Sequence, residues 1–165
     1  MMEPFSMRFL LFLPLVSLFP LSAFADEIVP QDGAWTTQMT EVTLTEACPA
    51  ETTAAVLPQF EQSLEQPSTR EVEFGDRFDP NLLEEGERPY GWAQTGDNTW
   101  EGAMLSDGDQ KIGIATLTVQ SDALISVLGE VELAPMLNPA EDPDFTAMFP
   151  PGCSAQMTFQ INHDG

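Results

Sequence analysis

Alternating apolar and polar residues dominate much of the chain, and this period of two predicts β-strands. The clearest case is the segment 154–162, whose apolar residues share one side: Ala155, Met157, Phe159 and Ile161. That side is expected to face a core, and the opposite polar side to face solvent. Similar strands are predicted at 71–74, 90–93, 99–105, 111–119 and 124–133.

Short connections rich in turn residues separate these strands. Gly96-Asp97-Asn98 and Asp107-Gly108 have the composition of hairpin turns, and the segment 120–123 is equally short. Because strands joined by short turns pair in antiparallel fashion, residues 90–133 are expected to form a meander of four strands. The segments 154–162 and 71–74 can be added to it.

The segment 35–45 and the residues after it break the simple alternation. Its apolar side changes from odd to even positions, which predicts a β-bulge near Thr40 and Glu41. Apolar residues then recur at helical spacing over 52–65, and Pro58 either kinks this helix or sets its first turn. The expected fold is mainly β: an antiparallel meander of about six to seven strands forming a small barrel or sandwich, with one short helix after the first strand.

The amino-terminal residues have the three parts of a secretory signal. Arg8 precedes an apolar run over 9–21, and Ala23-Phe24-Ala25 supplies the small residues of a cleavage site. We therefore expect a signal peptide over 1–25, cleaved after Ala25, and a single exported domain over 26–165 in the periplasm or outside the cell. No later stretch is apolar enough to span a bilayer.

The formal charge is −22, and it is unchanged by removal of the predicted signal, which contains Glu3 and Arg8 and leaves 26 acidic and 4 basic residues. Such a surface repels phosphate backbones and anionic lipid headgroups, so nucleic-acid and membrane-surface binding are disfavoured. Two interpretations stay open. The charge either serves a basic partner or a cation, or it keeps the protein dissolved in a salty medium.

Cys48 and Cys153 are the two cysteines of the chain. An even pair in an exported domain predicts a structural disulfide, which would join the end of the first strand to the start of the last. Neither a C-x-x-C pair nor neighbouring histidines suggest redox or metal chemistry at these positions.

The segment 134–152 does not fit the meander, because it contains five prolines together with large apolar residues. Long loops inside compact domains usually have a function or are disordered, and disordered segments are poor in such apolar residues. The segment is therefore expected either to pack as a lid over one end of the sheet or to present an adaptable apolar surface.

Motifs of enzymatic sites are missing from the sequence. There is no G-x-S-x-G, H-E-x-x-H, P-loop, G-x-G-x-x-G or calcium loop, and His163 is the only histidine. We predict no catalytic residues, no cofactor and no metal site. The acidic turns 84–87 and 107–109 would attract Ca²⁺ only weakly and are better explained as solvated loops.

Gly33-Ala34-Trp35 resembles the G-x-W motif that opens lipocalin-type barrels. The resemblance covers three residues, and a helix after the first strand departs from the lipocalin pattern, so no family is assigned from it. The triplet is also explained by a Trp that fills the end of a β core after a sharp turn at Gly.

Three hypotheses follow for the role of the domain. The first is a non-enzymatic protein that binds an apolar or amphipathic ligand between sheet aromatics and the proline-rich loop, with five residues as candidates: Trp92, Trp100, Phe145, Met148 and Phe149. The second is an interaction or inhibitor module for a basic extracytoplasmic protein, anchored by the apolar loop. The third is a hydrolase that uses two carboxylates.

Overall fold

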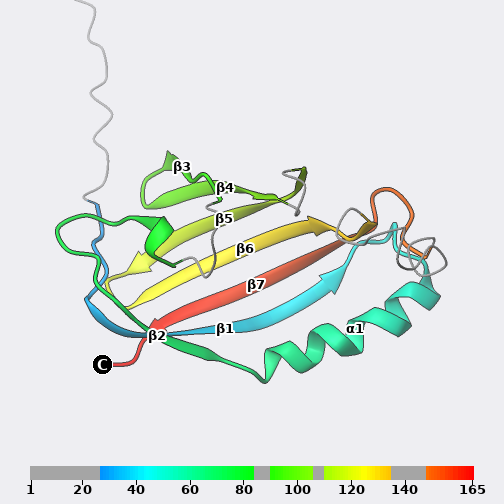
Figure 1. Cartoon of the computed structure of the whole chain (residues 1–165), viewed down its shortest axis with the longest axis horizontal. Helices are drawn as coiled ribbons and strands as arrows, with labels where there is room; N and C mark the ends of the chain where they lie inside the picture. The colour runs from blue at the N-terminus through cyan, green and yellow to red at the C-terminus, as the bar shows by residue number, and fades with distance from the viewer. Residues whose placement is uncertain (1–26, 84–89, 106–109, 135–147) are drawn as a thin grey trace, which may run out of the picture.

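The chain forms one antiparallel sheet of seven strands in the computed structural model, which describes residues 27–83, 90–105, 110–134 and 148–165 (Figure 1). The strands are β1 (Gly33–Leu44), β2 (Ser68–Val72), β3 (Ala93–Gly96), β4 (Thr99–Leu105), β5 (Lys111–Ser121), β6 (Leu124–Glu132) and β7 (Ser154–His163). Helix α1 (Ala50–Leu64) follows β1, and a short 3₁₀ helix, η1 (Pro80–Leu83), follows β2. The predicted mainly β fold with one helix after the first strand is confirmed.

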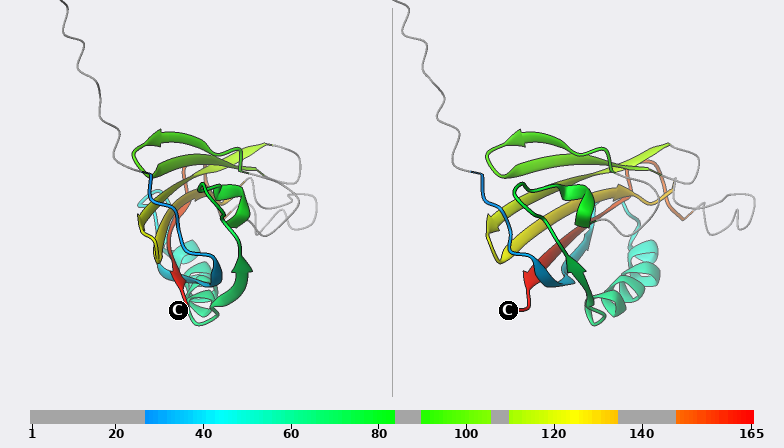
Figure 2. Two further views of the ribbon diagram at one scale, coloured as in Figure 1. Left: turned by 90° about the vertical axis from the view of Figure 1, so that its left-hand side faces the viewer. Right: turned by 60° about the vertical axis from the view of Figure 1, so that its left-hand side comes forward.

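Neighbouring strands in the sheet follow the order β2-β1-β7-β6-β5-β4-β3. The predicted meander is confirmed from β3 to β6 and continues into β7, after which β1 and β2 complete the sheet. Figure 2 shows that the sheet is strongly curved, with η1 and the segment that leads to it from β2 on the concave side. It is not closed into a barrel, because no pairing joins β2 to β3 among the residues that the structure describes. The concave side is called the inner face below.

The strand bounds agree with the predicted ones for β4, β5, β6 and β7 to within two residues. The bulge in β1 is also confirmed, since the pairing of β1 with β7 shifts register between Met39 and Glu41. This shift moves the inward side chains from odd to even positions, so that Val42 still faces the core opposite Met157.

The prediction for the strand before β4 was wrong by three residues, since β3 begins at Ala93 rather than Tyr90. Gly91 has a φ of 64°, which turns the chain, and the carbonyl of Tyr90 accepts a hydrogen bond from the amide of Ala103 in β4. The apolar side chains of Tyr90 and Trp92 therefore pack on the inner face of β4 instead of extending a strand.

The prediction for β2 was also displaced, because this strand ends at Val72, before Phe74. The side chain of Asp32 accepts hydrogen bonds from the amides of Phe74 and Gly75, at 2.7 and 3.2 Å. Gly75 has a φ of 69°, so the chain turns there and carries Phe74 and Phe78 over the inner face.

Helix α1 lies beside β1 and covers one end of the inner face (Figure 1). Its apolar residues Val56 and Phe60 pack against side chains from β6 and β7, as their helical spacing predicts. Pro58 lies inside the helix, where it supplies no amide donor. Within the described residues, no helix is long and apolar enough to cross a membrane.

Thr52 in the first turn of α1 is fully buried, and its hydroxyl donates a 2.6 Å hydrogen bond to the carbonyl of Met148. We expect Thr52→Val to lower the free energy of unfolding by about 1 to 3 kcal/mol, because it removes the hydrogen bond to this part-buried carbonyl. Urea unfolding followed by circular dichroism measures the change. Thr53→Val is the matched control, because the Thr53 hydroxyl bonds only to the nearby carbonyl of Pro49 at 3.2 Å. Equal losses in both variants would contradict the prediction.

Two clusters of buried apolar residues fill the inner face. The first, called the Trp35 cluster, joins Trp35 to Phe74, Phe78 and Trp100 and to inward residues of β5, β6 and β7. The second, called the disulfide cluster, lies toward α1 and joins Val56 and Phe149 to Val131, Ala155 and Met157, among others. The sheet therefore has a well-packed core at each end.

The predicted disulfide is confirmed, since Cys48 and Cys153 are bonded across a sequence separation of 105 residues. Both cysteines belong to the disulfide cluster, and the bond joins the residues after β1 to the residue before β7. A structural disulfide is consistent with a non-cytoplasmic protein, because cytoplasmic thiols are kept reduced.

Trp35 fills the core after a sharp turn, as the second explanation of the G-x-W triplet expects. Its side chain is 0% exposed, and its indole nitrogen donates a 2.9 Å hydrogen bond to the carbonyl of Gln31. Gly33 has a φ of 138°, and a Cβ there would lie 2.7 Å from Nε2 of His163. Only glycine fits this turn without strain.

Candidate functional site

A cavity of about 170 Å³ lies on the inner face between the Trp35 cluster and the disulfide cluster. Its position between them follows from its wall, which includes Leu117 and Ile161 of the first cluster and Met157 of the second. The described residues that line it are Thr37, Leu83, Tyr90, Trp92, Met104, Ala115, Leu117, Val127, Gly129, Met157, Phe159 and Ile161.

The floor of the cavity is built by five adjacent strands, β1, β7, β6, β5 and β4. Thr37 is opposite Ile161, Phe159 is opposite Val127, and Met157 is opposite Gly129 in the register of the sheet. Because alternate residues of a strand share one face, these side chains all point inward. Met104, Val127 and Phe159 are only half-buried there, so the floor keeps accessible apolar surface.

Gly129 makes room in the middle of this floor. A Cβ at Gly129 would have ordinary contacts of 3.9 Å with the sulfur of Met104 and the carbonyl oxygen of Met157. The space above this glycine is therefore part of the cavity, and its φ lies outside the left-handed region. A larger side chain at position 129 would extend into the cavity without backbone strain.

One side of the cavity is formed by Tyr90 and Trp92, whose rings are 5.3 Å apart at an interplanar angle of 45°. This pair lies directly on β4 because Gly102 has no side chain there. A Cβ at Gly102 would lie 2.8 Å from atoms of both Tyr90 and Trp92. Leu83, at the end of η1, completes this side of the wall.

The wall has little polarity. Its side-chain oxygens belong to Thr37 and Tyr90, and no charged side chain lines it in the part of the chain that the structure describes. The neighbouring Thr36 hydroxyl, on the opposite face, bonds to Thr69 and Asp164. The described wall can therefore hold an apolar group with at most a few hydrogen bonds.

The five candidate residues for a ligand surface are distributed over different parts of the fold. Trp92 lines the cavity. Trp100 is buried in the Trp35 cluster, and Phe149 is buried in the disulfide cluster with Met148 packed against it. Phe145 and most of the proline-rich segment lie outside the described residues. Of the four candidates that the structure describes, it therefore brings Trp92 to the cavity.

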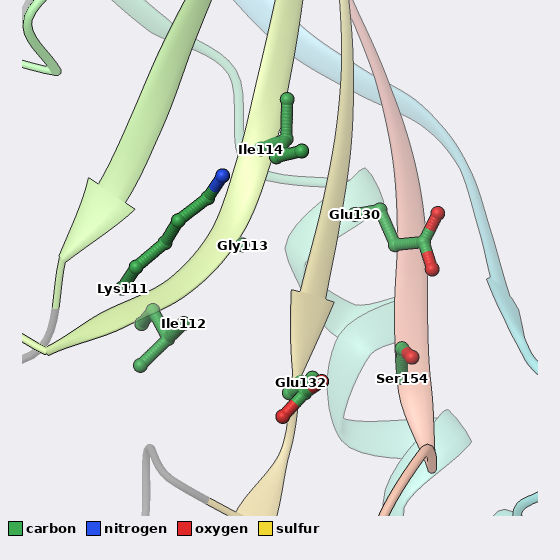
Figure 3. Close-up of a pocket in the computed structure, with 7 residues that line it drawn as sticks. All are labelled: Lys111, Ile112, Gly113, Ile114, Glu130, Glu132 and Ser154. Carbon is green, nitrogen blue, oxygen red and sulfur yellow. The ribbon is translucent and has the colours of Figure 1, made fainter.

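A second hollow lies on the opposite face of the sheet, near the ends of β5 and β6 (Figure 3). It is lined by residues that include Lys111, Ile114, Glu130 and Glu132. Figure 3 shows the Lys111 amino group directed along β5 toward Ile114, whereas the carboxylate of Glu130 is turned toward β7. The hollow is open, and its charged side chains do not converge on one point.

Groups of carboxylates suitable for a metal ion are not found in the described ranges 27–83, 90–105, 110–134 and 148–165. Glu130 and Glu132 share the open outer hollow rather than an enclosed cleft, so they offer little support for a hydrolase. The acidic turns 84–87 and 107–109 and the predicted signal over 1–25 lie outside the described residues.

Several wall residues were missed by reasoning from the sequence, notably Thr37, Met104, Gly129 and Phe159. Gly129 did carry a signal, because it is a glycine at an inward position of an otherwise apolar strand. The other three are inward residues like those of any half-buried strand. They line one cavity only because the fold places five strands side by side.

Comparisons of the chain with protein families, curated proteins and solved structures find no match. The functional proposal therefore rests on the cavity and on the residues that line it.

Proposed function

We propose that this protein is an exported, non-enzymatic binding protein that takes up a small apolar or amphipathic ligand in the cavity of the inner face. The observation that carries the proposal is an apolar hollow of about 170 Å³ on the inner face, partly open to solvent, with half-buried Trp92, Met104 and Phe159 in its wall. Sites for small molecules are typically concave and lined mostly by apolar and aromatic side chains with few polar groups, and the described wall of this hollow has that composition.

The size of the cavity limits the ligand. An apolar cavity of about 150 Å³ accommodates benzene, so the ligand is expected to have about six to ten non-hydrogen atoms buried there. Ligands of this size bind with about −4 to −8 kcal/mol, which corresponds to dissociation constants from millimolar to micromolar. Such affinities suit a carrier or sensor of an abundant small molecule.

The alternative of a protein-interaction module is less well supported by the described residues. Its proposed anchor, Phe149, is only 5% exposed and belongs to the disulfide cluster. Export is supported by the disulfide and by the amino-terminal pattern of Arg8, an apolar run and Ala23-Phe24-Ala25.

Methyl NMR of methionine residues tests the proposal directly. Met104 and Met157 line the cavity, whereas Met148 is not among the residues of its wall. Titration with toluene should shift the methyl signals of Met104 and Met157 in a saturable manner and leave Met148 unchanged. The absence of saturable shifts up to the solubility limits of toluene and of the more polar p-cresol would contradict the proposal.

Filling the cavity should abolish binding without unfolding the protein. Gly129→Leu places a side chain in the cavity, and we expect it to weaken toluene binding at least about tenfold by occupying the space. Its free energy of unfolding should stay within about 1 kcal/mol of the wild type or rise, because glycine is unfavourable inside a strand. The two quantities are measured by methyl NMR titration and by urea unfolding.

Thr118→Leu is the matched control, since Thr118 lies on the opposite face of β5 and its substitution adds bulk outside the cavity. Val127→Phe fills the same cavity from another position of the wall. If both filling variants fold and still bind toluene like the wild type, the ligand does not occupy this cavity.

A further inference from the structure

The hydroxyl of Thr37 is a polar group placed in an apolar wall. Thr37 lies on β1 with Ile161 beside it on β7, and both face the cavity. No described residue forms a hydrogen bond with the Thr37 hydroxyl, whereas those of Thr36 and Thr40 on the same strand are both bonded. A ligand in the cavity would shield the Thr37 hydroxyl from water.

Because of such shielding, the free energy of binding depends on whether the ligand can form a hydrogen bond with this hydroxyl. A hydroxyl that loses water without gaining a partner costs free energy, so a purely apolar ligand is penalised. A ligand that offers one hydrogen-bonding group at this position avoids the penalty. Sites of this kind discriminate strongly against analogues that lack the polar group.

Charge restricts the ligand further. The basic residues in the described part of the chain are Arg70, Arg77 and Lys111, and none of them lines the cavity. Lys111 lies at the hollow on the opposite face. An anion entering the cavity would meet no cation among the described residues of the wall, and the net charge of −22 would repel it on approach.

We propose that the ligand is a small uncharged molecule with an apolar body and one hydroxyl or carbonyl group, and that Thr37 is the specificity-determining residue that binds this group. This inference rests on the function proposed above. The apolar body lies over Gly129, between Met104, Met157 and Phe159, and the polar group points toward β1. Carboxylic acids of the same shape are excluded.

Three probes of nearly the same shape test the inference: toluene, p-cresol and 4-methylbenzoate, each titrated at pH 7 and followed by the methyl signals of Met104 and Met157. In the wild type, p-cresol is expected to bind more tightly than toluene, and 4-methylbenzoate should cause no saturable shift. Binding of 4-methylbenzoate as tightly as p-cresol would overturn the inference.

Thr37→Val removes the hydroxyl and keeps the shape of the side chain. The preference for p-cresol over toluene should fall by about 3- to 12-fold, which corresponds to the net free energy of one hydrogen bond. Thr37→Ser should retain the preference, and Thr118→Val, which removes a hydroxyl on the opposite face of β5, should leave it unchanged. Because the Thr37 hydroxyl forms no hydrogen bond with any described residue, Thr37→Val should unfold at the same urea concentration as the wild type.

Failure of the inference is distinguishable from failure of the proposed function. If toluene and p-cresol both bind and Thr37→Val leaves their ratio unchanged, Thr37 does not select the ligand, although the cavity is a binding site. Loss of the preference in Tyr90→Phe but not in Thr37→Val would likewise overturn the inference. If neither toluene nor p-cresol shifts Met104 and Met157, the proposed function itself is wrong and the inference with it.

Discussion

Reduction of the Cys48–Cys153 disulfide is expected to lower the free energy of unfolding by about 4 to 5 kcal/mol, the largest effect we anticipate from a single chemical change. The bond closes a loop with a sequence separation of 105 residues, so its removal returns much conformational freedom to the unfolded chain. The folded state also loses the link between the residues after β1 and the start of β7.

Urea unfolding of oxidised protein, reduced protein and the double variant Cys48→Ala/Cys153→Ala measures this loss. Agreement between the reduced protein and the double variant would assign the effect to the cross-link rather than to the sulfur atoms. Equal urea midpoints for oxidised and reduced protein would show that the cross-link contributes nothing to stability.

Trp35→Ala is expected to lower the free energy of unfolding by about 3 to 5 kcal/mol, because it removes a large side chain that is completely buried. The indole contacts the rings of Phe74 and His163, with centroids 5.6 and 5.3 Å away. Its loss leaves a cavity at the centre of the Trp35 cluster. The same urea experiment measures the change.

Two further variants separate the contributions at this position. Trp35→Phe keeps an aromatic ring and loses the hydrogen bond to Gln31, so a smaller loss of about 1 to 2 kcal/mol is expected. Trp92→Ala should cost less stability than Trp35→Ala, because Trp92 is half-buried beside the cavity. A Trp35→Ala protein as stable as Trp92→Ala would contradict this ranking.

The strands were predictable because each has a strong local pattern. The alternation in β7 places Met157 and Ile161 on one side whatever the partner strands are. The bulge in β1 was predictable for the same reason, since the change of period is visible within the strand itself. The predicted strand bounds were wrong at Tyr90 and Phe74. The chain turns at Gly91 after Tyr90, and the amide of Phe74 bonds to the side chain of Asp32 instead of to a neighbouring strand.

The cavity was not predictable from local pattern. Phe149 and Trp100 look like surface anchors in a proline-rich loop and a short strand, yet both are buried by packing against distant residues. Trp92 reaches the cavity only because Gly102 on β4 has no side chain that would occupy this space. Such contacts depend on which strands become neighbours, and the sequence near each residue does not contain that information.

The sequence by itself determined the mainly β class, the helix after β1, the bulge in β1 and the pairing of two cysteines. These features follow from side-chain period and from residue types within short segments, which constrain the backbone locally. Only the tertiary structure decided that the sheet stays open and that Thr37 and Gly129 share one cavity. Their placement depends on the curvature of the sheet and on the gap between two packed clusters, which arise from contacts among residues far apart in the chain.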